Sequence, residues 1–461
     1  MRENVIVQVG QCGNQIGACF WDLVLKEHAS VCVDGEFDPC MSSYFRNVDV
    51  RTGDDSSGRL IRSLRARAVV IDTEEGVLSQ LLGSHLGELF DSCEFVKGES
   101  GAGNNFAHGH FGYGSEYGGA ILESVRRTVE RCDSLQSFSL VHSTGGGTGS
   151  GLGTFIIGAL GDEYSKVLRF SNSILPSADD DVITSPYNAA LALHELREHA
   201  DCIFPMDNQA LVDICNSVQN NKKAKNASVI ERGSSKKLAF DDMNSIAAHM
   251  MSNLTCGARF PGKMNVDISE VSTNLVPFPK MQFILSSLSP LYALKDTSCS
   301  TPTTKNLDRT FMGALARRNQ LIKCDPAHGQ FLSCALLMRG KVNISDINRY
   351  VERLSGQIDM ATWNPDGFKL GHCGVAPIGY SHSLLCLSNN SSICKLFRNM
   401  ERRFMSLYGR KAYLHHYTEF MEEDYMDQAL ETLKSAQDDY SQGLDRLDVL
   451  ARASSRSTVL G

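Results

Sequence analysis

Residues 142–153 read HSTGGGTGSGLG, and six of these twelve residues are glycine. Such a run costs backbone entropy, so it occurs either in a flexible linker or in a rigid loop that approaches a ligand closely. The residues on either side of the run distinguish the linker from the rigid loop. FSLV at 138–141 is a predicted buried strand, and apolar residues follow the glycines at helical spacing over 152–160. Because a linker would not join two core elements so abruptly, the run is predicted to be a rigid strand-to-helix loop.

The same strand–loop–helix unit recurs along the first 215 residues. Strands are predicted at 4–9, 68–71, 138–141, 170–175 and 201–206, and most are followed by a helical pattern. This alternation predicts an α/β fold with a doubly wound parallel sheet. Ligands on such sheets bind beyond the carboxyl ends of the strands. We therefore expect the loops GQCGNQ, DTEEG, SGAGNN, HSTGGGTGSG and PSADDD to meet there.

The pattern changes after about residue 260. Strands are predicted at 281–286, 330–338 and 381–387, and helices at 345–354, 392–408 and 422–438, the first two of these helices with Ser345 and Ser392 as N-caps. A long helix is predicted over 241–256, after a polar stretch, 216–237, that is predicted to be an exposed loop. The expected organisation is a nucleotide-binding domain (1–240), a central helix (241–257), an α+β intermediate domain (258–387) and a C-terminal helical region with a tail (388–461).

Composition excludes several classes of protein. The net charge is −8, from 53 acidic and 45 basic residues, which argues against nucleic-acid binding. No apolar run approaches the roughly 18 residues of a membrane helix, and the N-terminus lacks the pattern of a signal peptide. The fifteen cysteines are scattered and are expected to be buried free thiols. A soluble, intracellular protein without a membrane partner is expected.

The glycine loop has phosphate-binding chemistry of an unusual kind. It lacks the lysine of a P-loop and does not fit the dinucleotide fingerprint GxGxxG. Phosphate charge would then be offset by backbone N–H groups, the helix dipole and a magnesium ion. Asp72 and Glu74 are candidates to hold that ion, directly or through water, although a solvated turn explains these two acids equally well. His142 ends a strand and is expected to be a core residue rather than a catalytic base.

Four motifs together resemble the tubulin superfamily: GQCGNQIG at 10–17, GGGTGSG at 145–151, RFPGKMNVDISE at 259–270 and NLVPFP at 274–279. The resemblance extends to about residue 440. It implies a protein that binds GTP or GDP with Mg²⁺ and adds head to tail to other tubulin isotypes or to itself.

The resemblance also implies roles for single residues. Gln11 and Cys12 correspond to a first phosphate loop, and Glu74 to the acid near magnesium. The remaining correspondences are a γ-phosphate loop (Ala102, Gly103, Asn104), the main phosphate cradle (Ser143, Gly147, Thr148, Gly149), a ribose-side residue (Asp181), two asparagines that read guanine (Asn208, Asn244) and a stacking ring (Phe240). An asparagine can both donate to and accept from a base edge. Without the resemblance, an asparagine that begins a helix is more often a cap.

Glu270 is the catalytic candidate. In α-type chains a glutamate at this place reaches the neighbour's nucleotide and helps position the attacking water, whereas β-type chains have a lysine there. GTPase activity is therefore expected only on longitudinal association. The alternative interpretation of Glu270 is an acid favoured by the dipole at a helix N-terminus.

Three features differ from conventional α and β chains: the tail LARASSRSTVLG lacks glutamate, the stretch at 216–237 is long, and Ser185 stands where glutamate is common. SSYFRNVD at 42–49, SADDDVITSPYN at 177–188 and HADC at 199–202 resemble the ε branch of the family. That branch belongs to centrioles and basal bodies, so the resemblance implies a cytoplasmic, cytoskeletal protein of centriole, basal body and cilium, with centriolar proteins as partners. The alternatives are another divergent isotype, or a GTP-binding scaffold or switch that neither polymerises nor hydrolyses.

Overall fold

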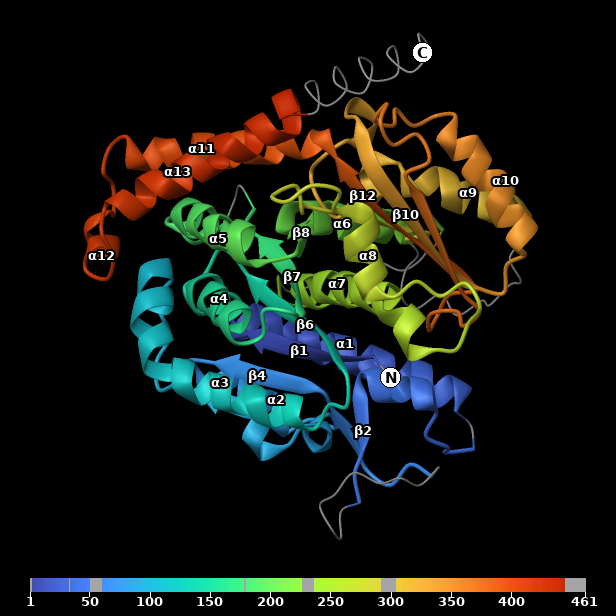
Figure 1. Ribbon diagram of the computed structural model, residues 1–461, viewed down its shortest axis with the longest axis horizontal. Helices are drawn as coiled ribbons and strands as arrows, with labels where there is room; N and C mark the ends of the chain where they lie inside the picture. The colour runs from blue at the N-terminus through green and yellow to red at the C-terminus, as the bar shows by residue number, and fades with distance from the viewer. Residues whose placement is uncertain are drawn as a thin grey trace, which may run out of the picture.

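The computed structural model describes residues 2–32, 34–49, 60–177, 180–225, 236–291 and 304–443. Its centre is a six-stranded parallel sheet in the order β5-β4-β1-β6-β7-β8 (Figure 1). The predicted doubly wound sheet is thereby confirmed, with β5 as a strand that the sequence pattern did not predict. The strands are β1 (Glu3–Val9), β4 (Ala68–Asp72), β5 (Phe95–Lys97), β6 (Leu135–Ser143), β7 (Leu168–Leu175) and β8 (Cys202–Asp207).

Helices cover both faces of this sheet, and β1 shows why. All seven of its residues are buried. Val5, Val7 and Val9 pack into one core, whereas Ile6 packs into the other. Because successive strand residues point to opposite faces, a strand buried on both sides must be apolar on both. One face is covered by α3 (Gly114–Glu130), α4 (Gly153–Glu163) and α5 (Ser185–His199), and the other by α1 (Gly10–Val31), α2 (Glu75–Leu82), α6 (Asn208–Lys225) and α7 (Lys236–Arg259).

A second sheet of four strands lies beside the first, with α7 between them (Figure 1). Its order is β11-β10-β12-β9, where β10 and β11 are parallel and the other pairs antiparallel. This mixed sheet confirms the α+β character expected after residue 260. Its elements are α8 (Ile268–Leu275), β9 (Leu285–Ser289), α9 (Thr304–Ala314), β10 (Phe331–Gly340), α10 (Ile344–Ser355), β11 (Phe368–Cys373) and β12 (His382–Asn390).

The C-terminal helices lie across α5 (Figure 1). They are α11 (Cys394–Tyr408), the short α12 (His415–Thr418) and α13 (Asp424–Asp438). Tyr187 of α5 packs edge-on against Phe404 of α11, and Arg197 of α5 donates a 2.9 Å hydrogen bond to the carbonyl of Thr432 in α13. A small antiparallel pair, β2 (Phe45–Asn47) and β3 (Leu64–Ala66), completes the fold.

The exposed loop expected over 216–237 is wrong where the structure describes that stretch. α6 continues to Lys225 and α7 begins at Lys236, and the remainder of the stretch lies outside the described residues. The apolar stripe of α6 ends at Val218, which packs against the core, but the backbone stays helical to Lys225, because lysine, alanine and glutamine are good helix formers. Lack of periodicity was therefore a poor indicator of a loop.

Both predicted serine caps are also wrong. Asn343 is the residue that precedes α10, and Ser345 lies inside the helix. Before α11 the chain makes a short 3₁₀ turn, Ser391–Ile393, in which the Asn390 side chain accepts a 2.8 Å hydrogen bond from the Ser392 N–H. In both cases an asparagine, which favours the N-cap as strongly as serine, lies just before the expected residue.

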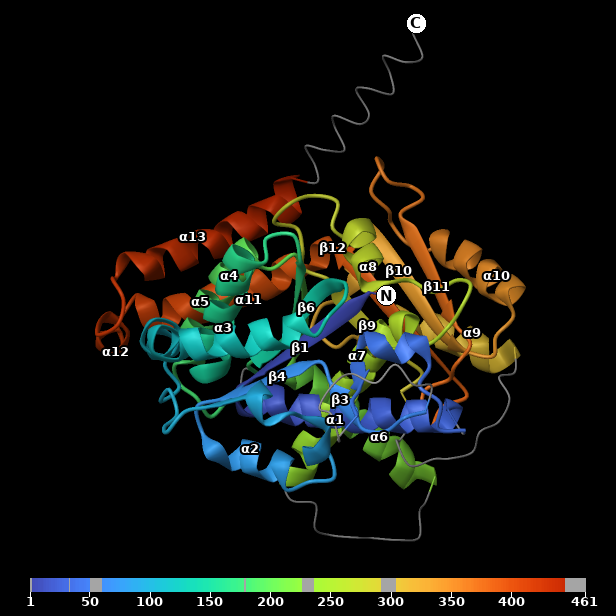
Figure 2. The same cartoon turned by 60° about the horizontal axis from the view of Figure 1, so that its bottom comes forward.

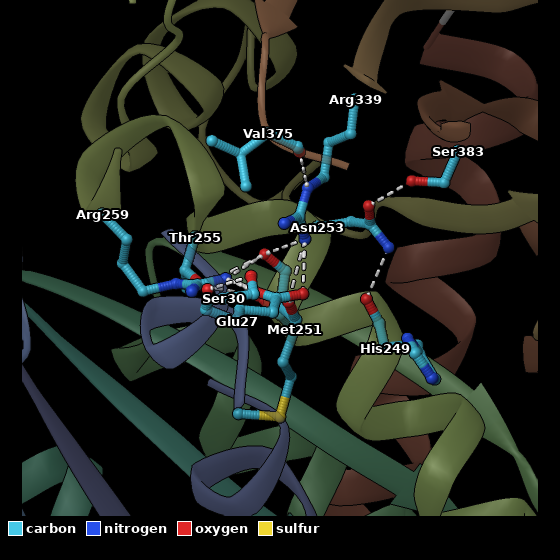
Figure 3. Close-up of polar contacts among 11 residues, drawn as sticks. Glu27, Ser30, His249, Met251, Asn253, Thr255, Arg259, Arg339, Val375 and Ser383 are labelled. Carbon is cyan, nitrogen blue, oxygen red and sulfur yellow. Dashed lines mark hydrogen bonds and ion pairs between the residues drawn. The ribbon is translucent and has the colours of Figure 1, made fainter. Parts of the chain in front are cut away.

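A buried ion cluster ties the two sheets together (Figure 3). Glu27 of α1 accepts from Arg259 of α7 at 2.8 Å and from Arg339 of β10 at 3.0 Å, and all three side chains are fully buried. Ser252 of α7 donates a further hydrogen bond to Glu27 at 2.9 Å. Burial acts to raise the pKa of Glu27, but the two guanidinium groups outweigh it and lower that pKa to about 2. The carboxylate is thus ionised and fixes α1 against both α7 and the mixed sheet.

Two further expectations can be compared with the described residues. The cysteines among them are free thiols; eight are buried, as predicted, and six are only partly buried. Within the same part of the chain, no helix combines the length and the apolar character needed to cross a membrane.

Candidate functional site

A cavity of about 580 Å³ opens at the carboxyl edge of the parallel sheet. All five loops singled out in the sequence contribute to its lining. Its volume is typical of a small-molecule site. The lining includes these residues named from the sequence: Gln11, Cys12, Glu74, Ala102, Gly103, Asn104, Ser143, Gly147, Thr148, Gly149, Asn208, Phe240 and Asn244.

The glycine run forms the floor where β6 passes into α4 through a π-helical turn, Thr148–Leu152. A Cβ atom on Gly149 would lie 2.8 Å from the carbonyl oxygen of Ser143. Gly10, where α1 begins, has a φ of +73°, and a Cβ there would lie 3.2 Å from the Gly149 nitrogen. Two helix N-termini therefore meet at the cavity with no room for side chains between them. Free N–H groups and dipoles at such ends bind anions.

Asn188 of α5 holds this floor in place, and the sequence analysis missed it. Its buried amide nitrogen donates to the carbonyls of Asn104 and Gly145, each at 2.8 Å. Its oxygen accepts from the Phe106 N–H at 3.0 Å and from the Tyr417 hydroxyl at 2.6 Å. One side chain thus joins two phosphate-side loops to the C-terminal region. No local sequence pattern indicates this role, because every partner is distant along the chain.

The loop at 102–105 is a tight turn beside the glycine run. Gly103 and Asn104 have φ values of +58° and +55°, and the Ala102 carbonyl accepts from the Asn105 N–H at 3.0 Å. Two successive residues with positive φ define a type I′ turn, which glycine and asparagine adopt most readily. A Cβ on Gly103 would meet no atom within 4 Å, so backbone conformation rather than space requires glycine there.

Two carboxylates, Asp72 and Glu74, lie at the phosphate side of the cavity. Burial raises the pKa of Asp72, whose carboxylate accepts from Asn14 Nδ2 at 3.4 Å. Between them, the Thr73 hydroxyl contacts the Thr148 hydroxyl at 2.7 Å and links β4 to the glycine loop. Within the described residues no three His, Cys, Asp or Glu side chains gather as a metal site. One or two carboxylates completed by phosphates and water is the arrangement that suits Mg²⁺.

Asn208, Phe240 and Asn244 lie at the α6–α7 side of the cavity. Phe240 is a large aromatic side chain that remains 54% exposed. Asn208 begins α6 directly after β8, and Asn244 lies in α7. Two amides and one aromatic ring thus line this side of the cavity.

The ribose side differs in detail from the expectation. Asp180 and Val182 line the cavity, whereas Asp181 between them is not part of the lining. Because residues 179–181 are all aspartate, the sequence did not indicate which of them would line the cavity. Gln15, Val77 and Asp241 are further lining residues that the sequence did not single out.

His142 and Cys12 are of residue types that can act as a base or a nucleophile, but their surroundings do not suit them to either role. His142 is fully buried, with Nδ1 2.8 Å from the Gly149 carbonyl and Nε2 2.8 Å from the Ser171 hydroxyl. Burial lowers its pKa to about 4, so it is the neutral core residue that was predicted. Burial raises the pKa of the Cys12 thiol to about 12, which keeps it protonated and unreactive.

Glu270 lies at the opposite edge of the sheet. It is in the first turn of α8, whose N-cap residue Asp267 accepts from Arg2 at 2.5 Å and from Gln136 at 2.6 Å. Arg2 precedes β1 and Gln136 lies at the start of β6, so α8 packs at the amino ends of the strands (Figure 2). The Glu270 carboxylate contacts Lys369 Nζ at 2.5 Å. Glu270 therefore lies far from the cavity of its own chain.

Comparison with known proteins agrees with this arrangement. Residues 3–216 match the family model described as Tubulin/FtsZ family, GTPase domain, and residues 279–402 match the Tubulin C-terminal domain. The chain is 47% identical to the tubulin epsilon chains of Homo sapiens and Mus musculus, over 96% of each chain. It is 34% identical to the nucleomorph tubulin beta chain of Guillardia theta, over 96% of this chain and 97% of that one. The chain therefore belongs to the tubulin family, and its N-terminal domain is a GTP-binding domain of that family.

Proposed function

We propose that this protein is an ε-type tubulin that binds GTP or GDP with Mg²⁺, associates head to tail with tubulin-family neighbours, and acts in the assembly or maintenance of centrioles and basal bodies. The observation that carries the proposal is the position of two features at opposite edges of one sheet. The glycine-floored cavity lies at the carboxyl edge, and Glu270 lies at the amino edge. A subunit with a binding end and a complementary end suits stacking.

At the phosphate side the chain contributes mainly backbone. The N–H groups at the starts of α1 and of the Thr148 turn would bind phosphate oxygens, and Gly147 and Gly149 allow that approach. Ala102, Gly103 and Asn104 would contact the terminal phosphate, and Gln11 and Cys12 the inner ones. Glu74, with Asp72 behind it, would hold Mg²⁺ directly or through water, and the ion would neutralise phosphate charge there.

At the base side, Asn208 and Asn244 would pair with the guanine edge while Phe240 stacks on its face. For the ribose we retain the 180–182 loop, with Asp181 as the residue named from the sequence and Asp180 as the one that lines the cavity. The same placement supports a division into a nucleotide domain at 1–240, a central helix at 241–257, an intermediate domain at 258–387 and a C-terminal region at 388–461.

Hydrolysis, where it occurs, would need a neighbour. Glu270 would orient water at the nucleotide of the adjacent subunit, because a carboxylate can accept a hydrogen bond from the attacking water. In the isolated chain this carboxylate is paired with Lys369 at 2.5 Å. That pairing favours a second candidate function, a GTP-binding scaffold that does not hydrolyse unless stacking separates the pair.

We propose a cytoplasmic, cytoskeletal location at the centriole, the basal body and the base of the cilium. Its partners would be other tubulin isotypes, or further copies of this chain, together with centriolar proteins. The similarity to tubulin epsilon chains over 96% of the sequence supports this location.

The nucleotide that copurifies with the protein tests the proposal most directly. Gentle purification, denaturation and chromatography of the released small molecules should give GTP or GDP and no ATP or ADP. Native mass measurement of the same sample would give the stoichiometry and the state of association. Equal amounts of adenine and guanine nucleotide would contradict the assignment of Asn208 and Asn244.

A further inference from the structure

Cations gather around α11 without carboxylate partners in the part of the chain that the structure describes. Several cations on other helices do pair with a carboxylate: Lys26 with Asp22, Arg127 with Glu123 and Arg353 with Asp308. No ion pair within the described residues involves the following group: Arg317, Arg318, Lys395, Arg398, Arg402 and Arg403. A group of unpaired cations on a protein of net charge −8 forms a surface that can bind an anion from outside the chain.

These cations line three hollows that share walls. The first, of about 550 Å³, includes Arg317, Lys395 and Arg398. The second, of about 420 Å³, includes Arg317, Arg318 and Lys323, and the third, of about 180 Å³, includes Lys323, Arg402 and Arg403. Because Arg317 and Lys323 are each shared by two hollows, the three lie side by side, and together they are called the basic groove.

This basic groove, defined by the seven cations Arg317, Arg318, Lys323, Lys395, Arg398, Arg402 and Arg403, runs from the rim of the nucleotide cavity to the start of α11. At one end Pro176 lines both the third hollow and the nucleotide cavity, and at the other end Ser391 and Ser392 line the first. Three carboxylates, Asp207, Asp213 and Asp325, lie among the seven cations. The groove is therefore locally positive and extends over several elements.

We propose that the basic groove binds an acidic segment of a separate polypeptide, rich in glutamate or aspartate. Five of the seven cations are arginines, whose planar guanidinium groups bind carboxylates through two parallel hydrogen bonds. The hollows are each the size of one or a few side chains, which suits an extended peptide with acidic residues at intervals. Three carboxylates within the groove, and a net negative charge on the rest of the chain, oppose the dense phosphates of a nucleic acid.

The chain's own C-terminal tail does not suit the groove. Residues 444–461 contain Asp445 and Asp448 but also Arg446, Arg452 and Arg456, so the segment is basic overall. A tail with more cations than anions gains nothing from a surface of the same sign. Residues 444–461 are therefore not the acidic segment that the groove would bind.

A fluorescein-labelled peptide of alternating glutamate and glycine tests the proposal, with a glutamine–glycine peptide as its match. Fluorescence anisotropy against the full-length protein should show binding of the glutamate peptide alone, weakening as NaCl is raised. Reversal of two groove charges, Arg317→Glu with Arg398→Glu, should weaken binding by at least about tenfold. Equal binding of both peptides, or wild-type affinity in this variant, would overturn the proposal.

The matched control changes two lysines that line none of the three hollows, Lys166→Glu with Lys434→Glu, for which no ion pair is found in the described residues. It alters net charge by the same amount and should leave peptide affinity within about twofold. All four residues are exposed, so both variants should keep the wild-type nucleotide content and melting temperature, which separates this proposal from the nucleotide assignment. A thymidine oligonucleotide that bound more tightly than the glutamate peptide would show that the groove recognises phosphate instead.

Discussion

At the carboxyl edge of the parallel sheet, the nucleotide cavity is floored by backbone, whereas at the amino edge α8 presents side-chain charges that are already paired. Gly10 and Gly149 approach each other too closely for side chains, so a larger residue at either position would change the shape of the cavity floor. Asp267 and Glu270 lie in contact with Arg2 and Lys369, so the chemistry at this edge comes from side chains that a substitution can remove one at a time.

We therefore expect mutations at the two edges of the sheet to impair different properties of the protein. Damage to the carboxyl edge should remove nucleotide binding, and with it everything that depends on nucleotide. Damage to the amino edge should leave a subunit that still binds but acts poorly on its neighbour. The predictions below test that division.

Gly149→Val should have the largest effect and abolish nucleotide binding. The added Cβ alone would come within 2.8 Å of the Ser143 carbonyl, and Asn188 fixes the same loop through the Gly145 carbonyl. Chromatography of bound nucleotide measures the loss. Gly119→Val is the matched control, because a Cβ at that exposed position on α3 meets no atom within 4 Å. Normal nucleotide content in Gly149→Val would mean that the phosphates bind elsewhere.

Glu270→Ala should lower association-linked phosphate release by about 100-fold, the effect expected for loss of a group that positions water. Its nucleotide content should stay at the wild-type level, because Glu270 lies at the other edge of the sheet. A phosphate-release assay over a protein concentration series measures both points. Glu431→Ala on α13 removes an exposed carboxylate elsewhere and should leave the rate unaltered. A wild-type rate that did not depend on concentration would contradict action on a neighbour.

Asn208→Asp should weaken guanine nucleotide binding by about 1–3 kcal/mol, which is roughly 5- to 150-fold, because an amide donor is replaced by a negative charge. Competition binding with a fluorescent GTP analogue measures the change. Asn216→Asp, an exposed position on the same helix, adds the same charge away from the cavity and should have little effect. If both variants bound GTP alike, Asn208 would not contact the base.

The pH dependence of stability should show the smallest effect and should arise at the carboxyl edge. The pKa of His142 is lowered to about 4, so between pH 6.5 and 4 the unfolded chain takes up a proton that the folded chain does not. Stability should therefore fall as pH falls from 7 to 5, with about 1–2 kcal/mol of that loss due to His142. Urea unfolding at both pH values should show a smaller loss in His142→Gln than in the wild type. His415→Gln, at an exposed position, should behave like the wild type.

Much of the fold could be predicted because its determinants are local. Each buried parallel strand is a short apolar run, and a distinctive loop follows most of them, so the sheet and its functional edge both come from short stretches of sequence. Most residues that the family resemblance assigned to the nucleotide line the cavity, although Asp181 does not. Asn188 could not be found this way, because its partners Phe106 and Tyr417 lie 82 and 229 residues away. Which of Asp180 and Asp181 lines the cavity depends on the backbone conformation of that loop. A run of three identical residues does not indicate that conformation.

The buried cluster of Glu27, Arg259 and Arg339 has a consequence for biosynthesis. Glu27 and Arg339 are 312 residues apart along the chain. A ribosome that adds about 5–20 residues per second needs roughly 16–60 seconds to make the second residue after the first. Throughout that interval the Glu27 carboxylate lacks the cation that Arg339 supplies. The packing of α1 against the mixed sheet, although α1 is encoded first, can therefore be completed only after β10 has been made.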